Sequence, residues 1–516
     1  DIREKRGSFL IKDKKKSVTT IQEINSISGN DSMVSVRGYF LSGKQSVSYQ
    51  LSFSLRSENQ LHIRLFASDK KYDRLYLSNH CSISEHFFGL GEQPTHLDHK
   101  GNRISVLVQE QGIGRGDMYT DKPVLDMIVH SLLGASAGND YTSYKPVPHY
   151  ISSLSNSIYL ENTEYSEFDF TQKDKIQIEV FSDTLQANII FAKKPLDAIE
   201  EYTLFSGRMQ PLPNWIQQGA VIGMQGGTEK VYEVWKTLEK AGTPISAFWL
   251  QDWVGQRITR FGKQLWWNWE LDDSHYPNWN KLLDSLHHKG INVMGYINPY
   301  LVELAGQKEK FKRDMYKEAL THHYLVCNKD GDPYQVNMGA FKASVTDLSD
   351  TSCVRWMKDI IRKELLGKGL SGWMADFGEA LPFDITLHSG EDPASYHQKY
   401  PEAWAKLNRE VIQEAGREDS IVFFSRSGFS KSPGYSTLFW QGDQLTGWGE
   451  NDGLPSSVTG LLSSGLSGFS LNHSDIGGYT SIGVSGISIL KRSRELLYRW
   501  MEMAAFTPVY RTHEGL

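Results

Sequence analysis

With 516 residues, the chain is too long for one ordinary domain, and its formal net charge of −6 gives it no basic excess. This charge balance argues against nucleic acid and anionic membrane surfaces as partners. No stretch of about eighteen apolar residues occurs, so we predict no membrane span. Three cysteines, Cys81, Cys327 and Cys353, form neither a disulfide framework nor a metal-ligand spacing. Their sparse use slightly favours the cytoplasm, while removal of a signal peptide before Asp1 would fit secretion.

The first 214 residues show the period-two alternation of antiparallel strands. Apolar side chains alternate over Val47–Leu55 and Leu61–Leu65, with Arg56–Gln60 as the turn between them, and again over Ile176–Val180. Repeated turns of this kind predict a β-sandwich domain over residues 1–214. An amphipathic helix, residues 195–207, and the proline-rich stretch 211–213 then form the linker to the next domain.

Residues 215–516 alternate between apolar strand-like runs and helical patterns. Several of the runs are continuously hydrophobic, as strands buried on both faces should be. The predicted strands are Ala220–Met224, Ile245–Leu250, Asn292–Ile297, Leu370–Ala375, Ile421–Phe424, Thr437–Trp440, Gly468–Leu471 and Phe506–Tyr510. The predicted helices are Glu229–Lys240, Lys281–His288, Thr351–Leu366, Glu402–Ala415 and Leu490–Met503. Eight strands with intervening helices predict a parallel (β/α)8 TIM barrel, so the fold class is α/β.

The connection between the third and fourth barrel strands is far longer than usual. It contains a charged helical pattern, Lys308–Glu318, and a hairpin pattern, Tyr324–Val336, around Asp330-Gly331-Asp332. We expect a small inserted subdomain, about residues 302–345, over the active-site face. Because the chain stops at Leu516 without a last barrel helix, we expect it to be part of a longer protein.

Polar side chains follow nearly every predicted barrel strand, on the rim where TIM barrels carry their active sites. They are Gln225, Gln251 with Asp252, Asn298, Asp376, Arg426, Asp443, His473 with Asp475, and His513. Two carboxylates on one rim, Asp376 and Asp443, suit the cleavage of a glycosidic bond, with one ionised and the other holding a proton. Arg426 is placed to hold the acid or a sugar hydroxyl. Tryptophans near the same ends are candidates for apolar walls: Trp249, Trp253, Trp266, Trp267 and Trp440.

No metal site and no cofactor site is predicted. The cluster of His96, Asp98 and His99 has no second group of ligands to complete it. The glycine-rich stretch, residues 112–116, lacks the strand–turn–helix frame of a dinucleotide site.

Several longer motifs resemble glycoside hydrolase family 31 and, within it, the bacterial sulfoquinovosidases. The motifs are HFFGLGE (86–92), MQGGT (224–228), QDW (251–253), GWMADFGE (372–379), WQGD (440–443), HSDIGGY (473–479) and RTHEG (511–515). The resemblance implies a retaining mechanism on α-glycosides, with Asp376 as nucleophile and Asp443 as acid/base. It implies that Gln225, Gln251, Arg426 and His513 hold sugar hydroxyls or support this pair. It also implies β domains after the barrel, which this chain lacks.

One position departs from the sulfoquinovosidase pattern. Those enzymes bind the sulfonate on C6 through an arginine, a tryptophan three residues later and a tyrosine acting through water. Trp267 and Tyr479 match, but Gln264 occupies the arginine position. A neutral amide cannot reproduce the bidentate, charge-assisted contact of a guanidinium. A charge for the sulfonate would have to come from Lys263, Arg257 or Arg260.

Four functions therefore stay open at this point. The leading one is a retaining α-glycosidase with a sulfoquinovosidase-like pocket, acting on a small carbohydrate, a glycoside or a glycolipid headgroup. The others are an α-glucosidase or α-galactosidase for an uncharged sugar, an α-glucan lyase, and a non-catalytic sugar-binding protein derived from a glycosidase. Oligomeric state is not determined by the sequence, and a homo-oligomer stays open.

Overall fold

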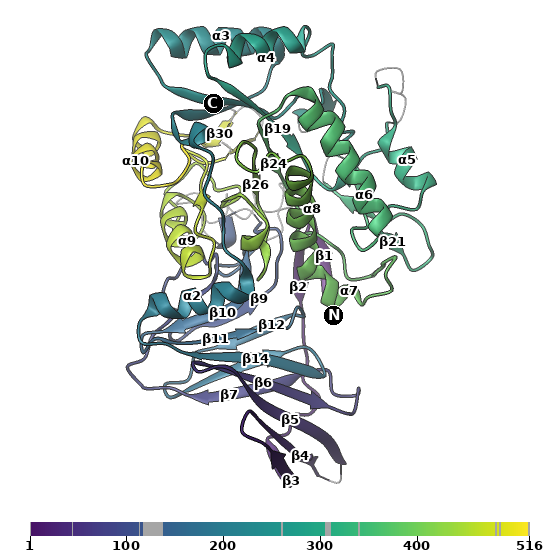
Figure 1. Ribbon diagram of the computed structural model, residues 1–516, viewed down its shortest axis with the longest axis vertical. Coiled ribbons are helices and arrows are strands. Elements are labelled where there is room, and N and C mark those ends of the chain that lie inside the picture. The colour runs from purple at the N-terminus through teal and green to yellow at the C-terminus, as the bar shows by residue number, and fades with distance from the viewer. Residues whose placement is uncertain are drawn as a thin grey trace.

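Two domains lie one above the other in the computed structural model, with the β-sandwich below and the barrel above (Figure 1). The structure describes residues 2–43, 45–112, 114–116, 138–259, 262–304, 311–338, 341–479, 482–484 and 487–513.

The N-terminal domain contains two antiparallel sheets. The larger has the strand order β3 (Ile21–Gly29), β4 (Met33–Ser42), β5 (Gln45–Ser57), β6 (Gln60–Ala67), β14 (Thr184–Phe191), β11 (Asn156–Leu160), β10 (Pro146–Ser152), β8 (Phe87–Gly91). The smaller has the order β7 (Leu75–His80), β13 (Lys175–Val180), β12 (Ser166–Asp169), β9 (Arg103–Val106). A separate hairpin pairs β1 (Ile2–Lys5) with β2 (Ser8–Ile11).

The alternation seen in the sequence places the predicted apolar side chains in the core between these sheets. Val47 and Tyr49 of β5 are buried, as are Ile176 and Ile178 of β13. The β-sandwich prediction is therefore confirmed. The helix after the sandwich, α2 (Pro195–Ser206), packs on β10, β11 and β14, and a short 3-10 turn, η2 (Asn214–Gln217), precedes the barrel.

The second domain is built on an eight-stranded parallel sheet, as predicted. Its order is β28 (Asn472–His473), β27 (Leu438–Trp440), β26 (Val422–Ser425), β24 (Gly372–Ala375), β19 (Asn292–Ile297), β16 (Ile245–Leu250), β15 (Ala220–Met224), β31 (Arg511–Thr512). The two outer strands approach each other where the Ile476 amide donates to the Arg511 carbonyl at 3.0 Å. The sheet therefore curls into a nearly closed barrel.

The last two barrel strands lie later in the chain than predicted. The predicted strands Gly468–Leu471 and Phe506–Tyr510 fall before β28 and β31, so these two predictions were wrong. Gly468 adopts φ +89°, which ends the preceding helix rather than starting a strand. Phe506 is 93% exposed in the turn after the last helix, so its apolar character does not mark a buried strand.

Helices follow the strands largely where periodicity predicted them. They are α3 (Gly227–Lys240), α4 (Trp279–His287), α6 (Thr351–Ile360), α8 (Tyr400–Glu414) and α10 (Arg494–Ala504). α6 continues through a π-helical stretch, Ile361–Leu365, and a 3-10 turn, Leu366–Lys368. Shorter helical pieces are α7 (Pro393–Tyr396), His397–Lys399, Ser432–Gly434 and Gly114–Gly116. The sequence analysis missed α9 (Leu454–Leu466), which packs against β8 of the sandwich and β28 of the barrel.

The long connection after β19 differs in detail from its prediction. A small sheet joins β20 (Tyr300–Leu301), β23 (Lys342–Val345) and β22 (Gln335–Asn337). The predicted hairpin around Asp330-Gly331-Asp332 is present, because Cys327 and Pro333 form an antiparallel bridge and the Tyr334 amide donates to the Val326 carbonyl at 2.8 Å. In addition, β21 (Cys327–Asn328) pairs with β25 (Ile385–Thr386), which the sequence did not predict. The predicted helix Lys308–Glu318 is corrected: α5 spans Met315–Thr321, with Asp314 as its N-cap, and residues 305–310 lie outside the described part.

Two further hairpins complete the barrel domain. β17 (Gln256–Thr259) pairs with β18 (Gly262–Leu265) directly after β16, on the active-site rim. β29 (Ile482–Val484) pairs with β30 (Ile487–Leu490). In the described part of the chain, no helix has the length and apolar character needed to cross a membrane.

The two domains share a hydrophobic core. Phe429, Phe439 and Phe469 of the barrel domain belong to the same buried cluster as Phe87 and Leu185 of the sandwich. The sandwich is therefore attached to the barrel through side chains that neither domain buries alone.

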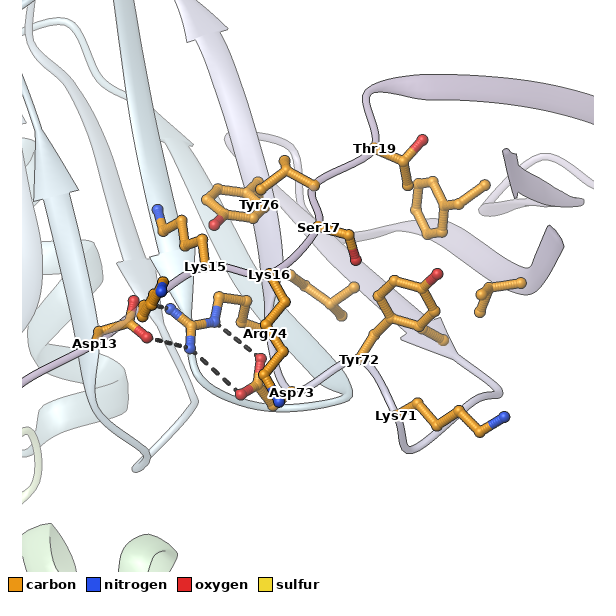
Figure 2. A pocket seen from close by; sticks show the side chains of 16 residues that line it. Asp13, Lys15, Lys16, Ser17, Thr19, Lys71, Tyr72, Asp73, Arg74 and Tyr76 are labelled. Carbon is orange, nitrogen blue, oxygen red and sulfur yellow. Dashed lines mark hydrogen bonds and ion pairs between the residues drawn. The ribbon is translucent and has the colours of Figure 1, made fainter. Parts of the chain in front are cut away.

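One cavity of about 290 Å³ lies in the N-terminal domain, under the segment 13–19 (Figure 2). Arg74 anchors that segment through an ion pair with Asp13 at 2.6 Å, and it also pairs with its own neighbour Asp73 at 2.9 Å. The floor of the cavity is formed by the buried side chains of Val47, Ala67 and Leu75. None of the predicted catalytic side chains faces this cavity, so it is not the candidate active site.

Candidate active site

A pocket of about 410 Å³ opens at the carboxyl ends of the barrel strands. It is lined by nine of the ten predicted site residues: Gln225, Gln251, Gln264, Trp267, Asp376, Arg426, Asp443, Tyr479 and His513. These residues come from six strand ends and two loops. They are spread over about 290 positions of the sequence, from Gln225 to His513. The tenth, Asp252, lies below the pocket.

Arg426 joins the two predicted catalytic carboxylates. Its Nε lies 3.4 Å from Asp376 Oδ1, and its Nη1 lies 3.3 Å from Asp443 Oδ2. The guanidinium is only 3% exposed and lies between the rings of Phe377, at 4.2 Å, and Tyr144, at 4.6 Å. One rigid, planar cation therefore fixes both carboxylates in the same pocket.

Asp376 is held at the end of β24 by further contacts. Its Oδ2 accepts a hydrogen bond of 2.7 Å from the Tyr296 hydroxyl, and its Oδ1 accepts one of 2.8 Å from the Phe377 amide. Phe377 adopts φ +60°, a costly conformation for an aromatic residue, of the kind that clusters at functional sites. The strand end is therefore bent so that the carboxylate projects into the pocket.

Two more carboxylates surround Arg426. Glu379 pairs with its Nη2, and Glu110 from the N-terminal domain lies 3.5 Å from the same atom. One guanidinium thus faces four carboxyl groups, and it cannot neutralise them all. Protons must therefore be retained within this cluster near neutral pH.

The pKa values of Glu379 and Asp443 are consistent with this excess of carboxyl groups over positive charge. Burial raises the pKa of Glu379 to about 7, against the opposing charge of Arg426. Burial also raises the pKa of Asp443 well above its usual range, and the negative charges of Glu110 and Asp376 add to the rise while Arg426 opposes it. The Asp443 side chain is nevertheless 32% exposed, so solvent in the open pocket moderates the effect. A carboxyl group that stays protonated beside an ion-paired one is the arrangement that acid catalysis needs.

Asp252 organises one side of the pocket from beneath. Its carboxylate is fully buried and accepts hydrogen bonds from the Gly226 amide at 2.9 Å, from Gln256 Nε2 at 2.9 Å and from the Tyr276 hydroxyl. His275 Nε2 lies 2.5 Å from the same group. Asp252 is 0% exposed and does not line the pocket, whereas its partners Gly226 and Gln256 do.

The glutamines above Asp252 form a chain of amides. Gln256 Nε2 donates to Gln225 Oε1 at 2.7 Å, and Gln225 Nε2 donates to Gln251 Oε1 at 2.7 Å. This chain orients the amide groups and leaves their remaining polar atoms for sugar hydroxyls.

The hairpin β17–β18 forms another wall. Gln264 and Lys263 both line the pocket, and Lys263 forms no ion pair with any residue that the structure describes. Arg257 lies directly opposite Gln264 in the hairpin register, but its guanidinium stacks on Phe341 at 3.7 Å. Arg260 lies outside the described residues. Of the two described candidates, Lys263 and Arg257, Lys263 is therefore the one that lines the pocket.

Aromatic side chains complete the pocket. Trp267 contacts Phe377 beside the nucleophile candidate, and Tyr479 contacts His513 at 4.6 Å between ring centres. Trp267 and Tyr479 therefore line the same pocket as the two carboxylates.

Sequence reasoning missed several groups that the fold brings here. Tyr296, Glu379, Glu110 and Gln256 all contact the predicted site residues. Trp440 was considered only as an apolar wall, yet it lines the pocket and its buried indole N–H has no hydrogen-bond partner among the residues that the structure describes. Glu379 lies three residues after Asp376 and was detectable from sequence, whereas Glu110 comes from another domain and was not.

Asp98 and His99, two members of the cluster considered as a metal site, take part in contacts within the sandwich. His86 Nδ1 contacts Asp98 Oδ2 at 2.5 Å, and His99 Nε2 contacts the Gly89 carbonyl at 3.0 Å. Among the described residues, no group of three or more potential ligands is arranged around a metal position.

Comparisons with known proteins decide the family. Residues 212–516 match the model of the glycosyl hydrolases family 31 TIM-barrel domain. Residues 5–169 match the glycosyl hydrolase 31 N-terminal galactose mutarotase-like domain. The chain belongs to glycoside hydrolase family 31.

Within family 31, the chain is similar to sulfoquinovosidases. It is 34% identical to a sulfoquinovosidase of Escherichia coli K12 over its whole length, covering 73% of that relative. It is 36% identical to a sulfoquinovosidase of Agrobacterium fabrum over 88% of the chain, covering 66% of that relative. A family 31 sulfoquinovosidase from E. rectale, solved with an aza-sugar inhibitor, superposes with a TM-score of 0.90 at 34% identity, covering 100% of this chain and 73% of the other. The chain is thus a sulfoquinovosidase-like glycoside hydrolase, which acts on O-glycosyl bonds, and it spans about two thirds to three quarters of these relatives.

Proposed function

We propose that this chain hydrolyses terminal α-glycosides with retention of configuration, through a covalent intermediate on Asp376. The observation that carries the proposal is the shared ion pairing of Asp376 and Asp443 to Arg426 within one pocket. Family 31 membership supports the reaction class.

The roles follow from the surroundings of the two carboxylates. Asp376 attacks the anomeric carbon while Asp443 gives its proton to the leaving oxygen, so the glycosidic bond breaks as the ester bond forms. Asp443 then removes a proton from water, which attacks the anomeric carbon and releases Asp376. The raised pKa of Asp443 suits it to the first protonation, and the contacts of Asp376 with Tyr296 and Arg426 suit it to ionised attack.

For the substrate, we propose an α-sulfoquinovoside whose sulfonate lies against Lys263, Trp267 and Tyr479. Similarity to two sulfoquinovosidases supports this choice. Lys263 lies on the pocket wall beside Gln264 and forms no ion pair within the described part of the chain. An ammonium group offers charge without the bidentate geometry of a guanidinium, so we expect weaker sulfonate binding than an arginine at position 264 would give.

Gln264 itself favours a second candidate, an uncharged α-glucoside. Its amide reaches the pocket and can donate one neutral hydrogen bond to a C6 hydroxyl. Initial rates on 4-nitrophenyl α-glycosides separate the two candidates. We expect the sulfoquinovoside to exceed the glucoside and galactoside in kcat/KM; a preference for the glucoside would establish the second candidate.

Two variants then test the source of specificity. Gln264→Arg should raise kcat/KM for the sulfoquinovoside at least about tenfold, equivalent to about 1.4 kcal/mol of transition-state stabilisation. Lys263→Met should lower it and weaken its dependence on salt, while the surface control Lys236→Met should change neither. A wild type that prefers the sulfoquinovoside, with no gain from Gln264→Arg and no loss from Lys263→Met, would show that neither position recognises the sulfonate.

A further inference from the structure

Lys145 is a completely buried lysine between the two domains. It belongs to the sandwich, directly before β10, and its side chain is 0% exposed. Its ammonium donates to the Arg426 carbonyl at 2.9 Å and to the Trp440 carbonyl at 2.8 Å, and it pairs with Glu92 Oε2 at 2.8 Å. All three N–H groups of the ammonium thus have an acceptor.

The two carbonyls lie at a particular place in the barrel. β26 and β27 are neighbours, and their last ladder pair is Ser425 with Phe439. The next residues along the two strands are Arg426 and Trp440, where the regular ladder has ended. The Lys145 ammonium binds both of these carbonyl oxygens. It therefore links the two strand ends one residue beyond their last ladder pair.

The link through Lys145 sets the position of the candidate catalytic groups. Arg426 carries the guanidinium that contacts both carboxylates, and Trp440 is followed after two residues by Asp443. The neighbouring Tyr144 stacks on the Arg426 guanidinium, and Gln111 Nε2 donates to the Asp443 carbonyl at 2.9 Å. The sandwich therefore contacts both the Arg426 guanidinium and the backbone of Asp443.

Burial of this ammonium is costly. Desolvation lowers the pKa of Lys145, and the positive charges of Arg115 and Arg426 lower it further, while Glu92 opposes them. Buried ion pairs seldom stabilise a fold more than apolar side chains of the same size would. A lysine here is therefore better explained by the geometry that its three hydrogen bonds impose.

We propose that Lys145 is a positioning residue for acid/base catalysis: it fixes the ends of β26 and β27 so that Asp443 faces the leaving oxygen. This inference rests on the proposed function of Asp443. It assigns the N-terminal domain a part in the chemical step, through a side chain that never touches the substrate.

The test compares leaving groups in Lys145→Met, which keeps the length of the side chain and removes its donors. General acid catalysis matters for an alkyl α-glycoside, and little for a dinitrophenyl α-glycoside whose leaving group needs no proton. We expect kcat/KM for the alkyl glycoside to fall at least about tenfold more than for the aryl glycoside. Rates are expressed per active site, counted by covalent labelling with an activated fluoro-glycoside, so that a partly unfolded sample does not mimic the effect.

Gln398→Met is the matched control. Gln398 is also fully buried between the domains, and its Nε2 donates to the Glu164 carbonyl at 3.2 Å, away from Asp443. Gln398→Met should lower the melting temperature without changing the ratio of kcat/KM between the alkyl and the aryl glycoside. Glu92→Gln, which weakens the hold on Lys145 but keeps the side-chain shape, should change the ratio in the same direction by a smaller factor, and it serves as the test if Lys145→Met does not fold.

The outcomes are distinguishable. An unchanged ratio in Lys145→Met, or in Glu92→Gln where Lys145→Met does not fold, would reduce Lys145 to a structural role and leave the proposed function intact. A wild type without activity on any α-glycoside would instead overturn the proposed function itself.

Discussion

Arg426 is the residue on which the electrostatics of the site depend. Its single positive charge lies within 3.5 Å of carboxylate oxygens from Asp376, Asp443 and Glu110, and it also pairs with Glu379. A cluster with one cation and four acids has more negative charge than it can hold in a buried site. Burial and the neighbouring carboxylates raise the pKa of both Asp443 and Glu379, which favours the protonated forms of these two groups.

The role of Asp376 gives the first prediction. Asp376→Ala should lose turnover almost completely while keeping the wild-type melting temperature within a few degrees, because the residue lies on the rim rather than in the core. A 5-fluoro-glycosyl fluoride should label the wild type on the peptide that contains Asp376. A label mapped to another carboxylate, such as Glu379, would contradict the assignment.

Asp443→Asn gives the second prediction. The amide cannot protonate a leaving group, so substrates with poor leaving groups should lose about 100-fold or more in rate, and activated aryl glycosides far less. Rates for a series of aryl glycosides of graded leaving-group pKa measure this directly. Equal losses across the series would remove Asp443 from the acid role.

Glu110→Gln gives the third prediction, on pH. The negative charge of Glu110 raises the pKa of Asp443, so its removal favours the ionised form and lowers that pKa. The protonated acid is then lost at lower pH, and the basic limb of the kcat/KM profile should move to lower pH. The reverse shift, or none, would show that Glu110 does not influence the acid.

At the scale of elements, the turn after β27 is where packing and catalysis meet. Gly442 adopts φ +77°, and a Cβ there would lie 2.2 Å from the buried Tyr144 ring. The turn therefore requires glycine for two reasons, its backbone conformation and the contact with the sandwich.

Gly442→Ala should consequently lower both stability and kcat. Gly390→Ala is the control, because Gly390 adopts φ +72° but a Cβ there would meet nothing within 4 Å. Both variants should lose about 1–2 kcal/mol of unfolding free energy through backbone strain. Only Gly442→Ala should displace Asp443 and lose kcat, as initial rates and thermal melts would show; comparable kcat in the two variants would contradict this.

Periodicity predicted those elements whose burial follows a simple repeat. β15, β16 and β19 were located to the residue, because each is a continuous apolar run between polar ends. α9 was missed because its serines and glycines are poor helix formers, and packing against β8 and β28 stabilises it instead. Pairing of β21 with the distant β25 carries no local signal either.

The residues of the site likewise divide into those that the sequence predicted and those that it did not. Asp376 and Arg426 were predictable because each is a polar residue directly after a buried strand, and Asp443 because it follows β27 after two residues. Asp252 also follows a buried strand and yet does not line the pocket, since position along a strand does not give the direction of a side chain. Glu110 and Lys145 were not predictable, because only tertiary structure brings the sandwich to the barrel rim.

At the scale of the whole molecule, the shared core predicts that the two domains unfold together. All fourteen tryptophans lie between Trp215 and Trp500, so tryptophan fluorescence reports on the barrel alone. Leu185 lies in the sandwich, is fully buried and belongs to the cluster that includes Phe429, Phe439 and Phe469 of the barrel.

Leu185→Ala should therefore lower the urea midpoint of the tryptophan signal, although no tryptophan lies in its domain. A buried leucine reduced to alanine costs about 2–5 kcal/mol, which a cooperative unit loses as a whole. Far-UV circular dichroism, which also reports on the sandwich, should give the same lowered midpoint. If the domains unfolded independently, the fluorescence midpoint would stay at the wild-type value while the circular dichroism trace split into two steps, and the barrel would then not depend on the sandwich for its stability.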